Sequence, residues 1–393
     1  MTRILFLHEV GYLEKPIFEM HEFPEHLSKR GHDVAFLDFL EFDHGDEKVR
    51  WGESRRGRVV PGANFLHFSQ TNPFSGLTKR LFAALTFSAC FRSVLDEFRP
   101  DVVVSFSVPT SGWQALHICR SLKIPYIFRA LDVSHKIRKS KWESLIKLAE
   151  KYIYRNSDWV SCNNPSMREY CISLGAREGS SSVDLPPLDL SHFEAVAGAD
   201  QELRRSLGIP LGATVFLYMG SFFYFSGLEN VLLALSAEES KPYLVLIGGG
   251  ECETGLKTLA KDLEIEHWVR FTGYVPFAEL PSYLAIADVA LNPMVPSLVS
   301  HNALPNKVLQ YMASGLPVVS TKLEGLHSLL GDARGLRLVS EPDDVLSEAV
   351  QFARDANKIE VGLGNRKAVR DNFATENAVD HFEHLIENLC KKP

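Results

Sequence analysis

The residues best suited to chemistry lie in one stretch of this chain, Pro305 to Ser320. Proline suits the first turn of a helix because its missing N–H would have no partner there, and the free N–H groups of that turn form a site for an anion. Gly315 then ends the predicted helix, and the valine-rich run that follows is typical of a buried parallel strand. A phosphate at the start of this helix would bring Gln310, about one turn further along, within reach of an attached ribose.

Lys307 is the one cation at the start of that predicted helix. An ammonium in this place would stabilise the negative charge that develops on a departing diphosphate. A surface lysine lying beside Tyr311 is the structural alternative. The amide of Gln310 can donate to and accept from ribose hydroxyls, although it lacks the charge-assisted bond that a carboxylate would form.

Two turns rich in glycine are the next candidates for holding a nucleotide. Gly220 and Ser221 follow a predicted strand and precede a helix, so the backbone there could approach a diphosphate closely. Gly249 and Gly250 belong to a run of three glycines in the same kind of position. Either turn could instead serve only to reverse the chain.

The stretch around Pro305 resembles the nucleotide-sugar signature of GT-B glycosyltransferases, in particular of the large retaining group called family 4. The usual form of that signature is a Glu, seven residues, a second Glu, and then Ala-Met-Ala-x-Gly-x-Pro-Val. In this chain the two acidic positions fall on Asn302 and Gln310. The first glycine turn departs as well, because Ser221 and Ser226 stand where the family usually has an Arg and a Lys.

The resemblance also implies which residues would bind the donor. The segment 269–276 resembles the family segment whose backbone holds the nucleotide base, and in the same register Asn302 would face the donor sugar. A plain loop role is the alternative for Asn302. The donor-binding set predicted in this way is Gly220, Ser221, Gly249, Gly250, Gly273, Tyr274, Asn302, Pro305, Asn306, Lys307, Val308 and Gln310.

In the first half of the chain, the run 126–135 ends a predicted strand and resembles an Arg-Asp segment of a subset of these transferases. Asp132 could orient the acceptor, Arg129 could bind a phosphate, and His135 could do either. An ion pair between Arg129 and Asp132 is the structural alternative. We predict that Asp132, His135 and Lys307 are catalytic and that Gly11 and Arg129 lie on the acceptor side.

Both halves alternate predicted strands and helices, which indicates an α/β protein with parallel, doubly wound sheets. Paired prolines at Pro186 and Pro187 interrupt the rhythm, and 393 residues are too many for one ordinary core. We therefore predict two Rossmann-like domains that face each other across a cleft, the GT-B arrangement. Residues 1–188 would bind the acceptor and residues 209–372 the nucleotide sugar, and the resemblance implies that a helix in 373–393 packs back on the first domain.

The apolar content of 45% and the charged content of 23% are those of a soluble globular protein. No apolar run is long enough to span a bilayer, and the start leaves no room for a signal peptide, so we expect a cytoplasmic protein. Six cysteines without Cys-x-x-Cys spacing predict neither disulfides nor a metal site. A net charge of −7 without a nucleic-acid-binding motif argues against a nucleic acid partner.

Two basic loops, one in 48–58 and one in 136–141, are most simply interpreted as solvated charge. Between them the segment 76–91 places Lys79 and Arg80 beside an apolar run. This combination could rest on the anionic inner face of a membrane and reach a lipid-linked acceptor, or it could be a buried helix.

The resemblance implies a retaining hexosyltransferase that moves a sugar from a nucleotide diphosphate sugar to a glycan, lipid-linked or small-molecule acceptor, as in polysaccharide or glycoconjugate biosynthesis. No metal and no other cofactor is expected, because helix N-termini and Lys307 would stabilise the leaving diphosphate. The alternatives on the same fold are a nucleotide-sugar epimerase and a weakly catalytic subunit that binds nucleotide sugars, which the amides of Asn302 and Gln310 suggest. An NAD-binding enzyme is disfavoured because no Gly-x-Gly-x-x-Gly opens a helix.

Overall fold

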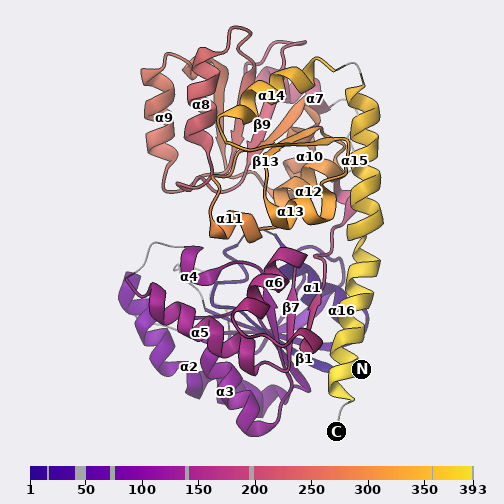
Figure 1. The fold of residues 1–393 in the computed structure, drawn as a ribbon. Coiled ribbons are helices and arrows are strands. Elements are labelled where there is room, and N and C mark those ends of the chain that lie inside the picture. The colour runs from indigo at the N-terminus through magenta and orange to yellow at the C-terminus, as the bar shows by residue number, and fades with distance from the viewer. Residues whose placement is uncertain are drawn as a thin grey trace. The chain divides into compact units, whose positions relative to one another are not determined.

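The computed structural model describes residues 1–15, 17–39, 50–70, 76–137, 141–193, 199–355 and 357–391. The chain divides into two compact units, Met1–Pro187 together with Glu376–Pro393, and Leu188–Thr375. The break falls directly after the paired prolines. Each unit contains a sheet of mainly parallel strands with helices packed against it, so the predicted α/β class with two doubly wound domains is confirmed (Figure 1).

The sheet of the first unit has the order β3-β4-β2-β1-β5-β6-β7-β8. All neighbours are parallel except β3 with β4. On β1 the buried side chains alternate, with Ile4 and Phe6 toward one face and Leu5 and Leu7 toward the other. The strands are β1 (Arg3–Leu7), β2 (Asp33–Asp38), β3 (Glu53–Arg56), β4 (Asn64–Ser69), β5 (Val102–Ser105), β6 (Tyr126–Ala130), β7 (Trp159–Cys162) and β8 (Ser181–Val183).

Helices cover both faces of this sheet. The helices α1 (Glu19–Lys29) and α16 (Thr375–Cys390) pack on the face that includes Ile4 and Phe6. The other face is covered by α2 (Gly76–Phe98), α3 (Gly112–Leu122), α5 (Glu143–Asn156) and α6 (Pro165–Ser173), and the short α4 (Ser134–Ile137) precedes α5. The last helix, α16 (yellow in Figure 1), belongs to the unit that contains the N-terminus, and its Phe382 ring lies 4.4 Å from the ring of Phe23.

The sheet of the second unit has the order β11-β10-β9-β12-β13-β14, and every pair is parallel. The strand order reverses between β9 and β12, and ligands of doubly wound sheets bind at such a reversal, outside the carboxyl ends of the strands. The strands are β9 (Val215–Met219), β10 (Tyr243–Ile247), β11 (Val269–Gly273), β12 (Val289–Asn292), β13 (Val318–Thr321) and β14 (Leu336–Val339).

One face of this second sheet forms a core with α8, α9 and α14. Within the described ranges, no helix is long and apolar enough to cross a membrane. The helices of the unit are α7 (Ala199–Ser206), α8 (Leu228–Ala237), α9 (Glu253–Asp262), α10 (Leu280–Ala285), α11 (Leu298–Asn302), α12 (Asn306–Ala313), α13 (Glu324–Leu330), α14 (Asp344–Ala353) and α15 (Lys358–Phe373).

Three local features differ from the sequence prediction. Pro305 is the cap before α12, with φ −69° and ψ 110°, and the helix itself begins at Asn306. In the basic loop 48–58, residues Glu53–Arg56 form the edge strand β3, which a run of charged residues does not signal. The segment 76–91 becomes the first part of α2, which buries Ala83, Phe87 and Phe91 and exposes Leu81 and Leu85.

Candidate active site

Three loops meet at the carboxyl ends of β9, β10 and β11. Each contains glycines of the predicted donor-binding set, and backbone hydrogen bonds join the loops to one another. Gly220 N–H donates to the Ile247 carbonyl (2.9 Å), Phe222 N–H to the Gly249 carbonyl (2.8 Å), and Gly248 N–H to the Gly273 carbonyl (2.8 Å). The structure therefore brings Gly220, Gly249 and Gly273 together at one edge of the sheet.

Contacts between two of these loops explain two of the three consecutive glycines. A Cβ atom at Gly248 would lie 2.1 Å from the carbonyl oxygen of Gly220, and a Cβ at Gly250 would lie 2.8 Å from that of Phe222. Both glycines also have positive φ, +121° and +153°. Gly248 and Gly250 are thus needed because the two loops approach each other too closely for a side chain to fit.

Other members of the predicted donor set remain accessible at this edge. Ser221 is exposed, and Tyr274 has an exposed fraction of 71%. A Cβ atom at Gly273 would meet no other atom within 4 Å, so space lies open beside it. These three residues can contact a ligand without rearrangement of the loops.

Lys307 lies in the first turn of α12 and points to the end of β9. Its Nζ donates to the hydroxyl of Tyr218 (2.9 Å) and lies 4.0 Å from the centre of the Tyr218 ring. The position of a Cβ on Gly220 would be 3.5 Å from this Nζ. Burial lowers the pKa of Lys307 to about 7. The lysine is therefore half-buried against the first glycine loop, where sequence reasoning left a surface position beside Tyr311 as the alternative.

A helix start usually leaves four backbone N–H groups without a partner, but the start of α12 leaves fewer. Val308 N–H donates to the Pro305 carbonyl (2.9 Å), and the Val308 side chain is buried in the core. The N–H groups of Asn306 and Lys307 have no partner within the described part of the chain. The half-buried amide of Gln310 likewise makes no hydrogen bond to a described residue, so it is available to a ligand.

Asn302 lies at the end of α11, where the resembled signature has its first Glu. Its side chain is buried, with 4% exposed, and its Nδ2 donates to the Leu298 carbonyl (2.8 Å). The hydroxyl of Ser297 caps the same helix by accepting from Ser300 N–H (3.1 Å). The Asn302 side chain therefore bonds to the backbone of its own helix, α11.

In the first unit, Arg129 is buried between α1 and α16. Its Nε donates to Glu19 (2.7 Å), Nη2 pairs with the same carboxylate, and Nη1 donates to Ser161 (2.8 Å). The guanidinium also lies over the ring of Phe23, at 5.3 Å. Burial raises the pKa of Glu19, and the charge of Arg129 opposes that rise. The sequence alternative of an ion pair with Asp132 is wrong, because Glu19 is the partner.

The two predicted catalytic residues of the first unit lie in different surroundings. Asp132 is an exposed residue, although desolvation by the surrounding protein raises the pKa of its carboxyl to about 6. His135 is buried, and its Nδ1 lies 2.6 Å from Glu150, which also accepts from the Tyr170 hydroxyl (3.2 Å). Of this pair, Asp132 alone is an exposed residue.

Gly11 precedes a loop that a buried polar network holds in place. A Cβ at Gly11 would lie 2.6 Å from a carboxylate oxygen of Glu14. The next residue, Tyr12, donates its N–H to Asp38 (2.7 Å) and its hydroxyl to Glu25. Arg58, from the basic loop predicted to be solvated, donates to the Tyr12 carbonyl (2.8 Å). Lys48, Arg138 and Lys139 of the two basic loops lie outside the described residues.

Two residues at the carboxyl ends of the strands were not predicted from the sequence. Tyr218 holds Lys307, and its only signal was a hydroxyl near the end of a predicted strand. His8 directly follows β1 of the first unit, its ring stacks on Phe106 at 5.3 Å, and its Nδ1 is buried without a partner in the described part of the chain. Burial lowers the pKa of His8 to about 3, so the imidazole is neutral at physiological pH.

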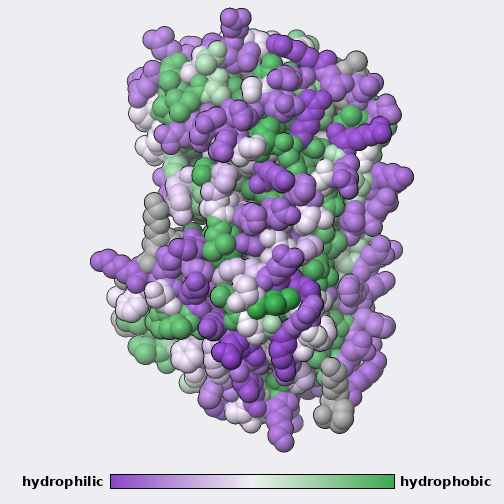
Figure 2. Space-filling model, viewed as in Figure 1, coloured by the Kyte–Doolittle hydropathy of each residue, from purple (hydrophilic) through white to green (hydrophobic). Residues whose placement is uncertain are grey.

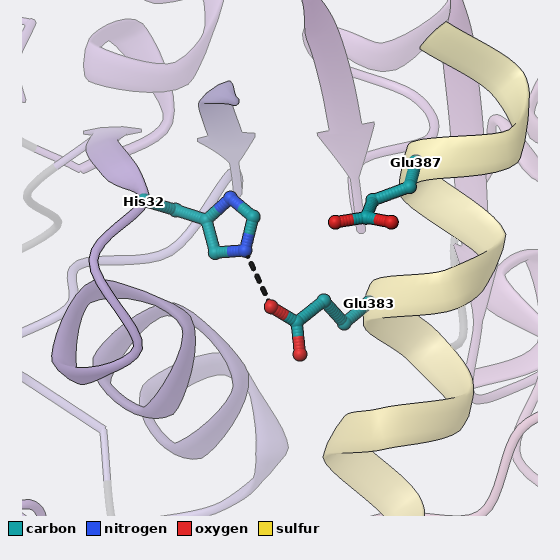
Figure 3. A group of neighbouring side chains, drawn as sticks. All are labelled: His32, Glu383 and Glu387. Atoms are coloured by element: carbon teal, nitrogen blue, oxygen red, sulfur yellow. Dashed lines mark hydrogen bonds and ion pairs between the residues drawn. The ribbon is translucent and has the colours of Figure 1, made fainter. Parts of the chain in front are cut away.

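Among the residues that the structure describes, one group of side chains has the composition of a metal site, namely His32, Glu383 and Glu387 (Figure 3). Thr2 N–H donates to Nδ1 of His32 (3.2 Å), so Nε2 carries the proton and donates to Glu383 (2.6 Å). Arg30 neutralises the same carboxylate at 2.5 Å. These contacts satisfy His32 and Glu383 without an ion, and they fasten α16 to the first unit.

The sequence matches two family patterns. Residues 199–367 match the glycosyl transferases group 1, and residues 20–181 match the glycosyl transferase 4-like domain. The two matches together cover most of both units. The chain therefore belongs to the GT-B glycosyltransferases of the family 4-like type, and it is a transferase.

Relatives and solved structures agree with this classification. The lipopolysaccharide core biosynthesis glycosyltransferase LpsE of Rhizobium meliloti is 29% identical over 70% of this chain and 83% of that protein. The alpha-monoglucosyldiacylglycerol synthase of Streptococcus pneumoniae is 27% identical over 81% and 74%, respectively. Among solved structures, sucrose-phosphate synthase from Thermosynechococcus elongatus has a TM-score of 0.81 (18% identity, 99% of each chain). Anabaena Alr3699/HepE in complex with UDP-glucose has a TM-score of 0.76 (16% identity, 99% of this chain and 100% of that one).

Proposed function

We propose that this glycosyltransferase takes its sugar from a nucleotide diphosphate sugar that binds at the carboxyl edge of the second sheet. The observation that carries the proposal is the Lys307 ammonium, held beside Gly220 at the start of α12. The N–H groups of Asn306 and Lys307 and the amide of Gln310 add donors along the same helix. The UDP-glucose named with the HepE structure, a neighbour of the same fold, supports a donor of this chemical class.

We further propose that the transfer retains configuration and needs no metal. An ammonium and two backbone N–H groups can stabilise a departing diphosphate as its charge develops. In this scheme Lys307 acts on the leaving group, and the carboxylate of Asp132, an exposed residue of the first unit, orients the acceptor. Arg129 and His135, with Gly11, would support the acceptor side from buried positions.

The acceptor in this proposal is a glycan or a lipid-linked sugar. The names of the two relatives, one concerned with a lipopolysaccharide core and the other with a glucosyldiacylglycerol, support a role in polysaccharide or glycoconjugate biosynthesis. Relatives named as glycosyltransferases favour transfer over an epimerase or an inactive binding subunit.

A screen against nucleotide sugars tests the donor proposal. The protein is heated with each member of a panel of UDP, GDP, ADP and dTDP sugars, and the sugar that raises the melting temperature is then incubated with lipid and glycan acceptors. We expect one donor to stabilise the protein and to release its nucleoside diphosphate only when an acceptor is present. Release of an epimerised free nucleotide sugar, or stabilisation by no member of the panel, would contradict the proposal.

We further propose a peripheral membrane contact on the outer side of the helix layer in which α3 packs against both α2 and α5, and we call it the α2–α5 surface. Its apolar members are all more than half exposed, although both helices also reach the core. Exposed Lys141, Lys147 and Lys151 surround the apolar groups on α5. The apolar members are Leu81, Leu85, Trp142, Leu145 and Leu148.

Apolar groups that gather on a water-facing surface mark an interaction site, and lysines among them favour anionic headgroups. In Figure 2, green apolar residues lie among purple hydrophilic ones at the lower left, over α2 and α5. Trp142 suits the headgroup region because its ring is apolar and its N–H is polar. The contact would bring the first unit to a lipid-linked acceptor.

Sedimentation with vesicles tests this surface. We expect the protein to pellet with phosphatidylglycerol vesicles and to stay in solution with phosphatidylcholine alone. Reversing Lys147 and Lys151 to Glu should weaken binding by at least tenfold, because each lysine near such a surface contributes about 1 kcal/mol. The control carries Lys257→Glu and Lys261→Glu, which make the same change of charge at exposed lysines of the second unit. Equal pelleting of the lysine variant and the control would remove the α2–α5 surface from the proposal.

A further inference from the structure

We propose that Tyr218 is a positioning residue that holds Lys307 in place, so that one lysine supplies the positive charge for the whole donor diphosphate. The inference rests on the proposed function of the same edge. It goes further by naming the residue that makes a single cation sufficient. The loops that follow β9, β10 and β11 (220–227, 248–252 and 274–276) contain no lysine and no arginine, so the charge must come from elsewhere.

The hydroxyl of Tyr218 links Lys307 to the first glycine loop. It donates its proton to the Ser221 carbonyl (3.0 Å), so a lone pair remains to accept from the Lys307 ammonium (2.9 Å). Tyr218 is 1% exposed on β9, in contact with the core of the second unit, so its ring has little freedom to move. The lysine head is thus held at one point relative to the loop that would receive a phosphate.

A second tyrosine fixes the helix that carries the lysine. The Tyr311 hydroxyl accepts from Met219 N–H (2.7 Å), which joins α12 to the end of β9. Burial raises the pKa of both tyrosines, so the titratable groups packed around Lys307 from β9 and from α12 are neutral. Burial of the lysine itself lowers its pKa to about 7. An incoming diphosphate would favour the charged form, and its binding would take up a proton.

The binding of a nucleotide sugar at several pH values tests this inference. The probe is the stabilising sugar from the panel, whose bridging diphosphate does not titrate between about pH 6 and pH 9. For the wild-type protein we expect the affinity to fall about tenfold over this range as Lys307 loses its proton. Lys307→Arg should remove the pH dependence because a guanidinium stays charged. Lys261→Ala, at an exposed lysine near the C-terminal end of α9, is the matched control and should behave as wild type.

The variant Tyr218→Phe keeps the ring and removes the hydroxyl. Without an oxygen to accept from the ammonium, the charged lysine is less stable and the lysine head is free to move. We expect affinity to fall about fivefold at low pH and the midpoint of the pH profile to move to lower pH, while the lost hydrogen bonds lower the melting temperature of the free protein by only a few degrees. A Tyr218→Phe profile that coincides with that of the wild type would overturn the inference. Failure of the wild type to bind any nucleotide sugar would instead overturn the proposed function.

Discussion

Lys307 and Arg129 are both basic residues, but they lie in different surroundings. Within the described part of the chain, the ammonium of Lys307 donates only to a neutral hydroxyl, so its charge remains available to an anion. The donors of Arg129 are taken by Glu19 and Ser161. From the sequence alone both could bind a phosphate, because Glu19 and Arg129 are 110 positions apart and only the fold brings them together.

Arg129→Ala should be among the most damaging single changes in the first unit. The substitution leaves Glu19 buried without its partner, which typically costs about 3 to 5 kcal/mol of unfolding free energy. The loss should shrink as the pH falls, because burial already raises the pKa of Glu19 and a protonated carboxyl needs no counter-charge. Urea unfolding at two pH values measures both effects.

Two further variants separate the buried ion pair from surface charge. Glu19→Gln combined with Arg129→Met removes both charges and should recover most of the lost stability. Lys257→Ala breaks the exposed pair with Glu253 (2.6 Å) and should cost less than about 1 kcal/mol. If Arg129→Ala costs no more than Lys257→Ala, the pair with Glu19 does not stabilise the first unit.

At the scale of elements, strands and helices with a run or a repeat of apolar residues could be predicted, and a strand without one was missed. The strands β1 and β9 are continuous apolar runs and were expected, as was a helix over the signature stretch. The strand β3 consists of Glu-Ser-Arg-Arg, and its pairing with β4 depends on backbone hydrogen bonds that side chains do not reveal. The packing role of Gly248 and Gly250 was also beyond the sequence, because three adjacent glycines look alike until the neighbouring loop is in place.

Replacing single glycines by alanine should distinguish a glycine that a contact between loops requires from a glycine that only weakens a helix. Gly248→Ala places a Cβ 2.1 Å from the Gly220 carbonyl at a φ of +121°, so it should destabilise the second unit by about 1 to 3 kcal/mol. It should also weaken nucleotide binding, because the first glycine loop must shift. Gly255→Ala is the matched change in α9, where a Cβ meets no atom within 4 Å, and it should stabilise by about 0.5 to 1 kcal/mol. Thermal melting of both variants decides between the two effects, and equal stability would show that the loops yield.

At the scale of the whole molecule, the chain builds two cores and closes the first with its last helix. Val379, Phe382, Ile386 and Leu389 of α16 lie in the same apolar cluster as β1 and α1. The buried members of the apolar cluster on one face of the second sheet run from Phe216 to Phe352, all within the second unit. A change in one core should therefore act on one unit.

Phe382→Ala tests this division at the point where α16 enters the first core. The ring is fully buried against Phe23, and its removal should cost about 3 to 5 kcal/mol of the stability of the first unit. Phe352→Ala is the matched change in the core of the second unit, where the ring is also fully buried. In scanning calorimetry we expect two transitions, with each variant lowering a different one. The stabilising nucleotide sugar should raise only the transition that Phe352→Ala lowers, since ligand stabilises the unit that binds it. A shift of both transitions by either variant would mean that the two cores unfold as one.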